Sequence, residues 1–303
     1  MKLNQLKMAL AVADKGSVRG AARDLAVSQS ALTQSLGELE RELGAPLFER
    51  RVRGMSPTPV GQIFLRRAAV ITSEEKRARE EVAYYLGSDQ GDVGVGLSVV
   101  AHMVLLPMAL PLFQQRFADV RLRIVEAPFP IIEARLRDGS MDFYIGPAPA
   151  LPPGPEFTVE KLFDNTRAVF VRRGHPLAQA GSLAELAGAK WVTTGITDKA
   201  EAELAELFAR HGEPAPRLLV QAESMLTLLT TLMASDAVAM TLRQYEEFPL
   251  TRGALQRIPV REVLPAPPIV AIRRAALPLP PAADYFCDMF RRASVAYVSS
   301  LGA

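Results

Sequence analysis

The chain has 303 residues, of which 49% are hydrophobic and 22% charged, a balance typical of soluble proteins with two or three compact units. The net charge of only +2 excludes a chain that is basic throughout, and the single cysteine, Cys287, excludes an intrachain disulfide. We expect no membrane span, and the N-terminus lacks the apolar segment of a secretion signal. We therefore expect a cytoplasmic protein with no membrane partner.

Positive charge is concentrated at the N-terminal end. The first 58 residues contain nine basic and six acidic side chains, so their net charge of +3 exceeds that of the whole chain. A local excess of Lys and Arg is common in proteins that bind nucleic acid. Since many neutral domains also have one basic end, the charge alone only hints at this function.

The same segment predicts three helices. Apolar residues recur at helical spacing between positions 3 and 13, and Gly16 ends this run. Ser17 can cap a second, short helix over residues 18–25, and Ser28 can cap a third helix that ends at Gly44. Two short helices, a tight turn and a longer helix are the pattern of a helix-turn-helix.

A basic hairpin and a long helix follow. Residues 47–57 form two short extended pieces around Gly54, which predicts a β-hairpin, or wing. Thr58 and Pro59 provide the favoured cap and first residue of a helix that continues to Leu86. At about 1.5 Å per residue, this helix would be roughly 40 Å long.

One side of the long helix is apolar. The predicted seam follows four- and three-residue steps, interrupted by one charge, and consists of Phe64, Ala68, Ile71, Glu75, Ala78, Val82 and Tyr85. A small N-terminal domain offers little surface to cover such a seam, so we expect it to pair with a second copy of the chain. The alternative is a core helix of the larger domain.

After a polar linker at 88–92, strands and helices alternate. The first set has strands at 93–100, 121–126 and 142–145, with helices at 104–117 and 131–137, and residues 146–154 look like a crossover. The second set has strands at 167–171, 191–193, 217–220 and 238–241, with helices at 199–210 and 225–233. A crossover at 265–268 leads to a strand at 269–273 and a helix near 281–298. This alternation predicts parallel, doubly wound sheets in two lobes with a cleft between them.

Four segments resemble the signature of LysR-type transcriptional regulators. They are residues 16–36, 39–44, 47–50 and 58–61, in the family's order and spacing. The chain departs from the common pattern at Ala9, Ser30 and Thr33, where the family often has Phe, Pro and Ser. The last two lie on the predicted recognition surface, so they bear on which bases are read.

The resemblance implies the organisation of the whole chain. We expect a winged helix-turn-helix DNA-binding domain at 1–58, a linker and dimerisation helix at 59–87, and an effector-binding domain at 88–303. The last would be a periplasmic-binding-protein-like α/β domain, with one lobe at about 91–162 and 269–303 and the other at about 163–268. The family commonly forms homotetramers, so a homodimer or homotetramer is expected.

The third helix is predicted to read DNA. Its first residues would meet base edges in the major groove of a pseudo-palindromic operator. The polar residues predicted to lie there, off the face of Ala31, Leu32 and Leu36, are Gln29, Ser30, Thr33 and Gln34. Gln can pair with adenine, and Ser or Thr can contact several bases. Arg50, Arg51 and Arg53 of the wing would reach phosphates or the minor groove.

A small organic anion is the expected effector. Ser98 closes the first strand, and the helix after it offers free N–H groups that favour a carboxylate or sulfonate. Thr193, Thr194 and Thr197 form a polar loop across the cleft, and family analogy adds Phe129 and Ile145. The full predicted set is Ser98, Val99, Val100, His102, Phe129, Ile145, Thr194 and Thr197, which suits an aromatic carboxylate or sulfonate.

The sequence gives no sign of an enzyme. Three widely spaced His residues and one Cys do not make a conventional zinc site, and nucleotide-binding and hydrolase motifs are missing, so no cofactor or metal is expected. An enzyme with scattered catalytic residues remains the weaker alternative. Another is a solute-binding protein whose N-terminal helices only oligomerise, which would bind a small ligand but no DNA.

Overall fold

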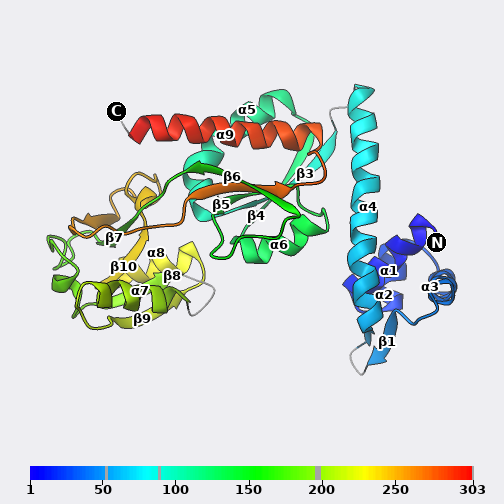
Figure 1. Cartoon of the computed structure of the whole chain (residues 1–303), viewed down its shortest axis with the longest axis horizontal. Coiled ribbons are helices and arrows are strands. Elements are labelled where there is room, and N and C mark those ends of the chain that lie inside the picture. Colours follow the sequence, from blue (N-terminus) through cyan, green and yellow to red (C-terminus); the bar gives the residue numbers. More distant parts are fainter. Residues whose placement is uncertain (52–53, 88–89, 195–198, 302–303) are drawn as a thin grey trace.

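We describe a computed structural model of the chain, covering residues 1–51, 54–87, 90–194 and 199–301. The N-terminal domain lies at one end, helix α4 (Pro59–Tyr85) stands beside it, and two α/β lobes extend away from that helix (Figure 1). Within the described residues, no helix is both long and apolar enough to cross a membrane.

The N-terminal domain contains the predicted helices and hairpin. Its elements are α1 (Leu3–Lys15), α2 (Val18–Asp24), α3 (Gln29–Leu43), β1 (Phe48–Arg51) and β2 (Gly54–Pro57). The hydroxyl of Ser17 accepts the N–H of Gly20, and that of Ser28 accepts the N–H of Ala31, so both predicted caps are confirmed. One apolar core, which includes Val12, joins these elements.

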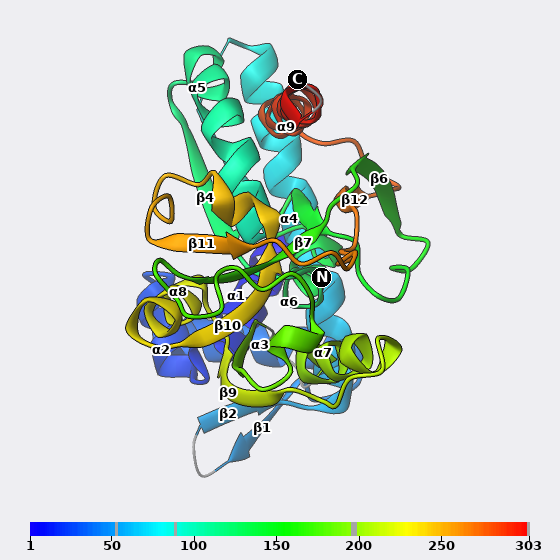
Figure 2. The same ribbon diagram turned by 90° about the vertical axis from the view of Figure 1, so that its left-hand side faces the viewer.

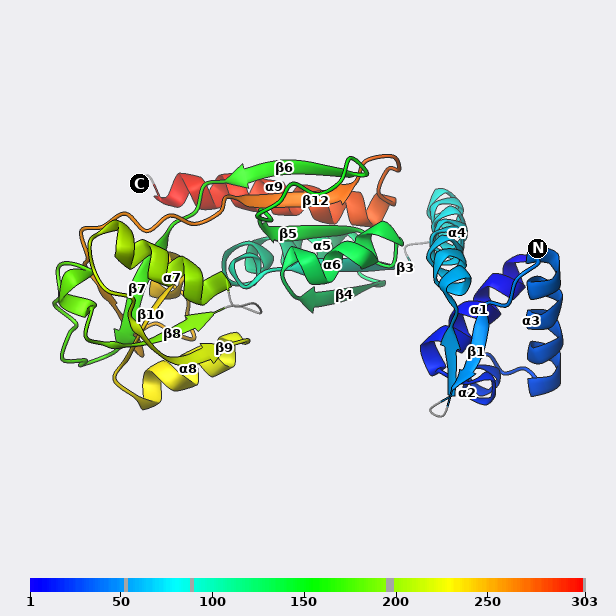
Figure 3. The ribbon, with the colours of Figure 1, turned by 60° about the horizontal axis from the view of Figure 1, so that its bottom comes forward.

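Helix α4 is fixed to this domain at its first turn. Thr58 caps it by accepting the N–H of Gly61, and Pro59 is its first residue. Gly61 lies so close to the hairpin that a Cβ there would be 2.0 Å from the carbonyl oxygen of Leu47. The helix start is therefore packed directly against the base of the hairpin (Figure 3).

The first lobe is built on one five-stranded sheet. Its strands, in spatial order, are β4 (Val120–Glu126), β3 (Gly91–Leu97), β5 (Phe143–Pro147), β12 (Ile269–Arg274) and β6 (Phe157–Phe163). Helical residues 99–116, comprising a π-helical turn and α5 (Leu106–Arg116), pack with α9 (Pro281–Leu301) over one apolar core. Helix α6 (Phe129–Arg137) covers a second core.

The second lobe repeats this plan (Figure 2). Its strands, in spatial order, are β11 (Leu255–Ile258), β7 (Arg167–Arg172), β10 (Ala237–Leu242), β8 (Lys190–Thr194) and β9 (Arg217–Ala222). Helix α7 (Lys199–Arg210) belongs to the core around Trp191, and α8 (Met225–Ala234) to the core around Phe170. Short 3-10 turns, η2 (Ala184–Leu186) and η3 (Arg243–Glu246), complete the lobe.

Both sheets are mixed, so the prediction of purely parallel sheets is wrong. In the first lobe β3 is parallel to β4 and β5, whereas β12 is antiparallel to β5 and β6. In the second lobe β8 is parallel to β9 and β10, whereas β7 is antiparallel to β10 and β11. β7 and β12 are the first strands after the chain passes from one lobe to the other. They run antiparallel to their neighbours because the chain reaches them without a crossover helix.

The chain passes between the lobes twice. Residues 146–154 do not form the first crossover, because they lead to β6 of the same sheet; the chain crosses at 164–166. The second crossover lies before β12, close to the predicted place. Thr166 and Pro265 form an antiparallel bridge between the two crossing segments. The lobes are thus joined by two neighbouring extended segments.

Candidate functional site

The start of α3 presents polar side chains to solvent. Gln29, Ser30, Thr33 and Gln34 are all exposed, whereas Leu32, Leu36 and Leu39 on the opposite side are buried. The Thr33 hydroxyl donates to the Gln29 carbonyl at 2.8 Å, and the Gln34 amide donates to Glu38 at 3.1 Å. Ala31, predicted on the buried face, is exposed. One residue corresponds to about 100° of rotation along an α-helix, so Ala31 is turned away from the core that holds Leu32.

The hairpin adds positive charge beside this helix. Arg50 and Arg51 are exposed on β1, and Arg51 Nε donates to Glu49 at 2.8 Å. Arg53 lies outside the described residues. Gly54 has a φ of 124°, and a Cβ there would be 2.4 Å from the Gly16 carbonyl oxygen. The Met55 N–H donates to that same oxygen at 2.7 Å, so the hairpin is held against the end of α1.

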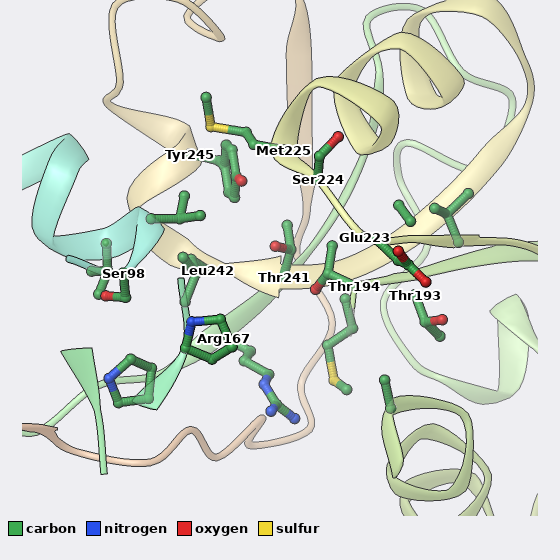
Figure 4. Close-up of a pocket in the computed structure, with 18 of the residues that line it drawn as sticks. Ser98, Arg167, Thr193, Thr194, Glu223, Ser224, Met225, Thr241, Leu242 and Tyr245 are labelled. Atoms are coloured by element: carbon green, nitrogen blue, oxygen red, sulfur yellow. The ribbon is translucent and has the colours of Figure 1, made fainter. Parts of the chain in front are cut away.

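A cavity of about 360 Å³ lies between the two lobes. The first lobe contributes Ser98, Val99, Val100 and Glu126 with the turn into α6, and the second lobe contributes the ends of its central strands. Ser98 lies on one side of the close-up, and Thr194 and Glu223 lie on the other (Figure 4). Apolar surface from Val192, Met240 and Leu242 lines the space between them.

Two buried hydroxyls in this cavity have no partner among the described residues. Ser98 is 9% exposed and Thr193 is 5% exposed, yet neither side-chain oxygen has a hydrogen bond. The Ser98 backbone is fixed, because its N–H donates to Ile145 O and its carbonyl accepts the His102 N–H. Buried polar atoms are rarely left unpaired, so a ligand or solvent is expected to meet these hydroxyls.

Charged groups also line the cavity. Arg167, the first residue of β7, donates to Glu203 of α7 at 3.0 Å. Glu126 ends β4, and Glu223 precedes Ser224, whose hydroxyl caps α8. Tyr245 is buried at the edge, and burial raises the pKa of its hydroxyl well above the usual range, with the nearby Glu126 adding to the shift.

The structure brings together only part of the predicted effector set. Val99, Val100 and Thr194 line the cavity with Ser98, whereas Thr197 lies outside the described residues. His102 is not among the lining residues; its Nδ1 lies 3.0 Å from the Ser98 carbonyl oxygen.

Phe129 and Ile145 are corrections to the predicted lining. Phe129, the first residue of α6, is 3% exposed and packs against Tyr144 and Phe157. Ile145 is fully buried in the core between the sheet and α9. Both lie near strand or helix ends, but their side chains point into the lobe because the sheet face there is covered by a helix. Arg167, Glu126 and Glu223 line the cavity and were not predicted from the sequence.

Helix α4 keeps an apolar face exposed. Val60, Ile63, Ile71, Val82 and Tyr85 lie on one side of the helix, and Tyr85 is 90% exposed. Two members of the predicted seam are covered by other parts of the same chain. Ala68 is buried and Phe64 packs against the N-terminal core, because the helix start lies on its own domain.

A winged helix-turn-helix joined by a long helix to a two-lobed domain defines a ligand-responsive DNA-binding regulator. The family model for the "Bacterial regulatory helix-turn-helix protein, lysR family" matches residues 3–62, and that for the "LysR substrate binding domain" matches residues 86–294. The chain belongs to the LysR family of transcriptional regulators and has a substrate-binding effector domain.

Named relatives agree with this assignment. The chain is similar to the HTH-type transcriptional regulator GbpR of Azospirillum brasilense, with 26% identity over 97% of this chain and 87% of that protein. It is also similar to TdcA of Escherichia coli K12, with 24% identity over 85% of this chain and 82% of that protein.

Solved structures share the fold. The crystal structure of CbnR, a LysR family regulator, has a TM-score of 0.70 at 22% identity, covering 97% of this chain and 99% of that one. A full-length variant of OxyR from Pseudomonas aeruginosa has a TM-score of 0.71 at 22% identity, covering 96% and 95%. Full-length CbnR in complex with its target DNA has a TM-score of 0.69 at 23% identity, covering 97% and 100%.

Proposed function

We propose that this regulator controls transcription in response to a small organic acid, such as an aromatic carboxylate or sulfonate, held between its lobes. The unpaired hydroxyls of Ser98 and Thr193, which face one cavity from different lobes, carry this proposal. Helical residues 99–116 begin directly after Ser98, so their first N–H groups add a partial positive charge where an acid group would dock. The apolar walls suit a ring or an alkyl chain.

The proposed response is a change in lobe arrangement. A ligand that contacts Ser98 in one lobe and Thr193 in the other is bound best when the lobes approach each other. Because the ligand would bind the arrangement with closer lobes more tightly than the open one, its binding would raise the population of the closer arrangement. Because α4 contacts the first lobe, the shift would reach the helix that positions the DNA-binding domains.

The proposed DNA surface comprises the start of α3 and the wing. Gln29, Ser30, Thr33 and Gln34 would contact base edges, and Arg50 and Arg51 would contact phosphates or the minor groove. Arg53 is kept in this proposal from its place in the sequence. Two copies paired through the exposed face of α4, as a dimer or within a tetramer, would read a pseudo-palindromic site in the cytoplasm, where the chromosome lies.

Calorimetric titration tests the effector site. Organic acids and sulfonates that raise the melting temperature are titrated into the wild type and the Ser98→Ala variant. Loss of one hydrogen bond to a charged group predicts about tenfold weaker binding. Ser299→Ala is the matched control, because Ser299 is not among the cavity-lining residues and its hydroxyl donates to Val295 O within α9. Equal affinities for the wild type and Ser98→Ala would reject the site.

A further inference from the structure

The described lining of the inter-lobe cavity carries more negative than positive charge. Its charged residues are Arg167, Glu126, Glu203 and Glu223. The guanidinium of Arg167 already donates to Glu203 at 3.0 Å, so this cation is largely neutralised within the protein. Glu126 and Glu223 remain, and neither has a hydrogen bond or ion pair with another described residue.

The two unpaired carboxylates approach the cavity from opposite lobes. Glu126 is the last residue of β4 in the first lobe, and Glu223 follows β9 in the second lobe. Figure 4 shows Glu223 beside Thr194. Closure on a purely anionic ligand would add a third negative charge with no free counter-ion among the described lining residues, which opposes both binding and closure.

The acid-binding features lie in the same cavity, one strand away from Glu126. The Ser98 hydroxyl is buried and unpaired, and the helical run of residues 99–116 begins beside it. These groups favour a carboxylate, whereas the carboxylates of Glu126 and Glu223 favour a cation. The cavity therefore has positions for both signs of charge: Ser98 and Glu126 lie at the ends of neighbouring strands of the first lobe, where Leu97 pairs with Glu126, and Glu223 lies in the second lobe.

We infer that the effector is an amino acid or a related amino-bearing acid, whose carboxylate meets Ser98 and whose ammonium meets Glu126 and Glu223. This inference rests on the proposed function and narrows its ligand. The carboxylate remains as proposed, and the ammonium supplies the counter-ion that the described part of the lining lacks. Arg167 and Glu203 pair with each other in the cavity wall, so neither is assigned to a charged group of the ligand.

A matched set of compounds tests the inference with the full-length protein. Each of the standard amino acids is compared with its deaminated acid and its decarboxylated amine by thermal shift, and the best series is titrated calorimetrically. At least one amino acid is expected to stabilise the protein more than both of its partners. Its affinity should fall about tenfold or more in Glu126→Gln/Glu223→Gln, since a charge-assisted contact is lost.

Glu201→Gln provides the control, because Glu201 is exposed on α7 and does not line the cavity. It should bind like the wild type. The inference is overturned if no amino acid exceeds its deaminated acid, or if the double Gln variant binds amino acids as well as the wild type. If deaminated acids bind best and Ser98→Ala lowers the affinity for them, the proposed function stands and only this inference fails. If Ser98→Ala changes no ligand affinity, the proposed site itself is rejected.

Discussion

Arg77 of α4 and Asp142 of the first lobe form an ion pair at 2.7 Å, with both side chains only 10% exposed. Asp142 also accepts the N–H of Gly94 at 2.9 Å. Burial raises the pKa of Asp142 and lowers that of Arg77, although each charge partly offsets the shift of the other. Nearby, the Ser73 hydroxyl donates to Gly139 O at 2.7 Å. The linker helix is thus attached to the effector domain by buried polar contacts.

We predict that the two members of this pair are energetically coupled. Arg77→Met leaves a buried carboxylate without its cation, and Asp142→Asn leaves a buried guanidinium without its anion. Each single change should lower the free energy of unfolding by about 3 kcal/mol, and Arg77→Met/Asp142→Asn should lose much less than the sum. Urea unfolding followed by circular dichroism measures the cycle. Additive losses would mean that the pair contributes no coupling.

Alanine substitutions at two glycines should have opposite effects on the free energy of unfolding. Gly61→Ala would force a Cβ against the carbonyl of Leu47, so we expect the N-terminal domain to lose about 2 kcal/mol. Gly37 lies within α3 with nothing within 4 Å of a Cβ, so Gly37→Ala should gain about 0.5–1 kcal/mol from helix propensity. Urea unfolding of both variants checks this; similar effects would show that the close contact at Gly61 does not constrain the helix.

The exposed face of α4 should determine association. Ile71→Glu/Val82→Glu places charges on this apolar face and should shift the protein toward monomers in light scattering. Operator affinity should fall as well, because paired recognition helices bind two half-sites together. The control Arg79→Gln changes another exposed residue of α4. An unchanged assembly in the double Glu variant would refute the proposed interface.

Cys287 should be unreactive in the folded protein. It is fully buried in α9, and burial raises the pKa of its thiol from 9.0 to about 11. The thiolate fraction at pH 8 then falls about 100-fold, and access is closed as well. Labelling with a disulfide reagent should be slow in buffer and rapid in denaturant. Rapid labelling of the native protein would contradict the described packing.

Local signals made most of the N-terminal domain and the start of α4 predictable from the sequence. The caps Ser17, Ser28 and Thr58 act within three residues, so their structural role is visible without tertiary information. Strands β6 and β11 were missed. Both are edge strands, where only one neighbour is needed, and β6 is partly exposed at most of its positions. Such segments lack a clear alternating pattern.

The cavity was only partly predictable for a different reason. Ser98 could be found because a strand, a hydroxyl and a helix start follow one another in the sequence. Arg167, Glu126 and Glu223 are far apart in the chain and meet only when the lobes assemble. The inward direction of Phe129 and Ile145 depends on which sheet face each helix covers, which sequence spacing does not determine.

The most direct test of the account is fluorescence anisotropy with labelled DNA from upstream of the chain's own gene and with a scrambled duplex of equal length. The wild type should prefer the upstream DNA, and its affinity should fall steeply with salt. Gln29→Ala/Thr33→Ala should lose roughly 10- to 100-fold on the upstream DNA, with little change on the scrambled one, because these side chains would contact bases. A matched Glu42→Ala variant should retain the preference. Equal weakening on both duplexes, or none, would contradict the assignment of α3 as the element that reads the sequence.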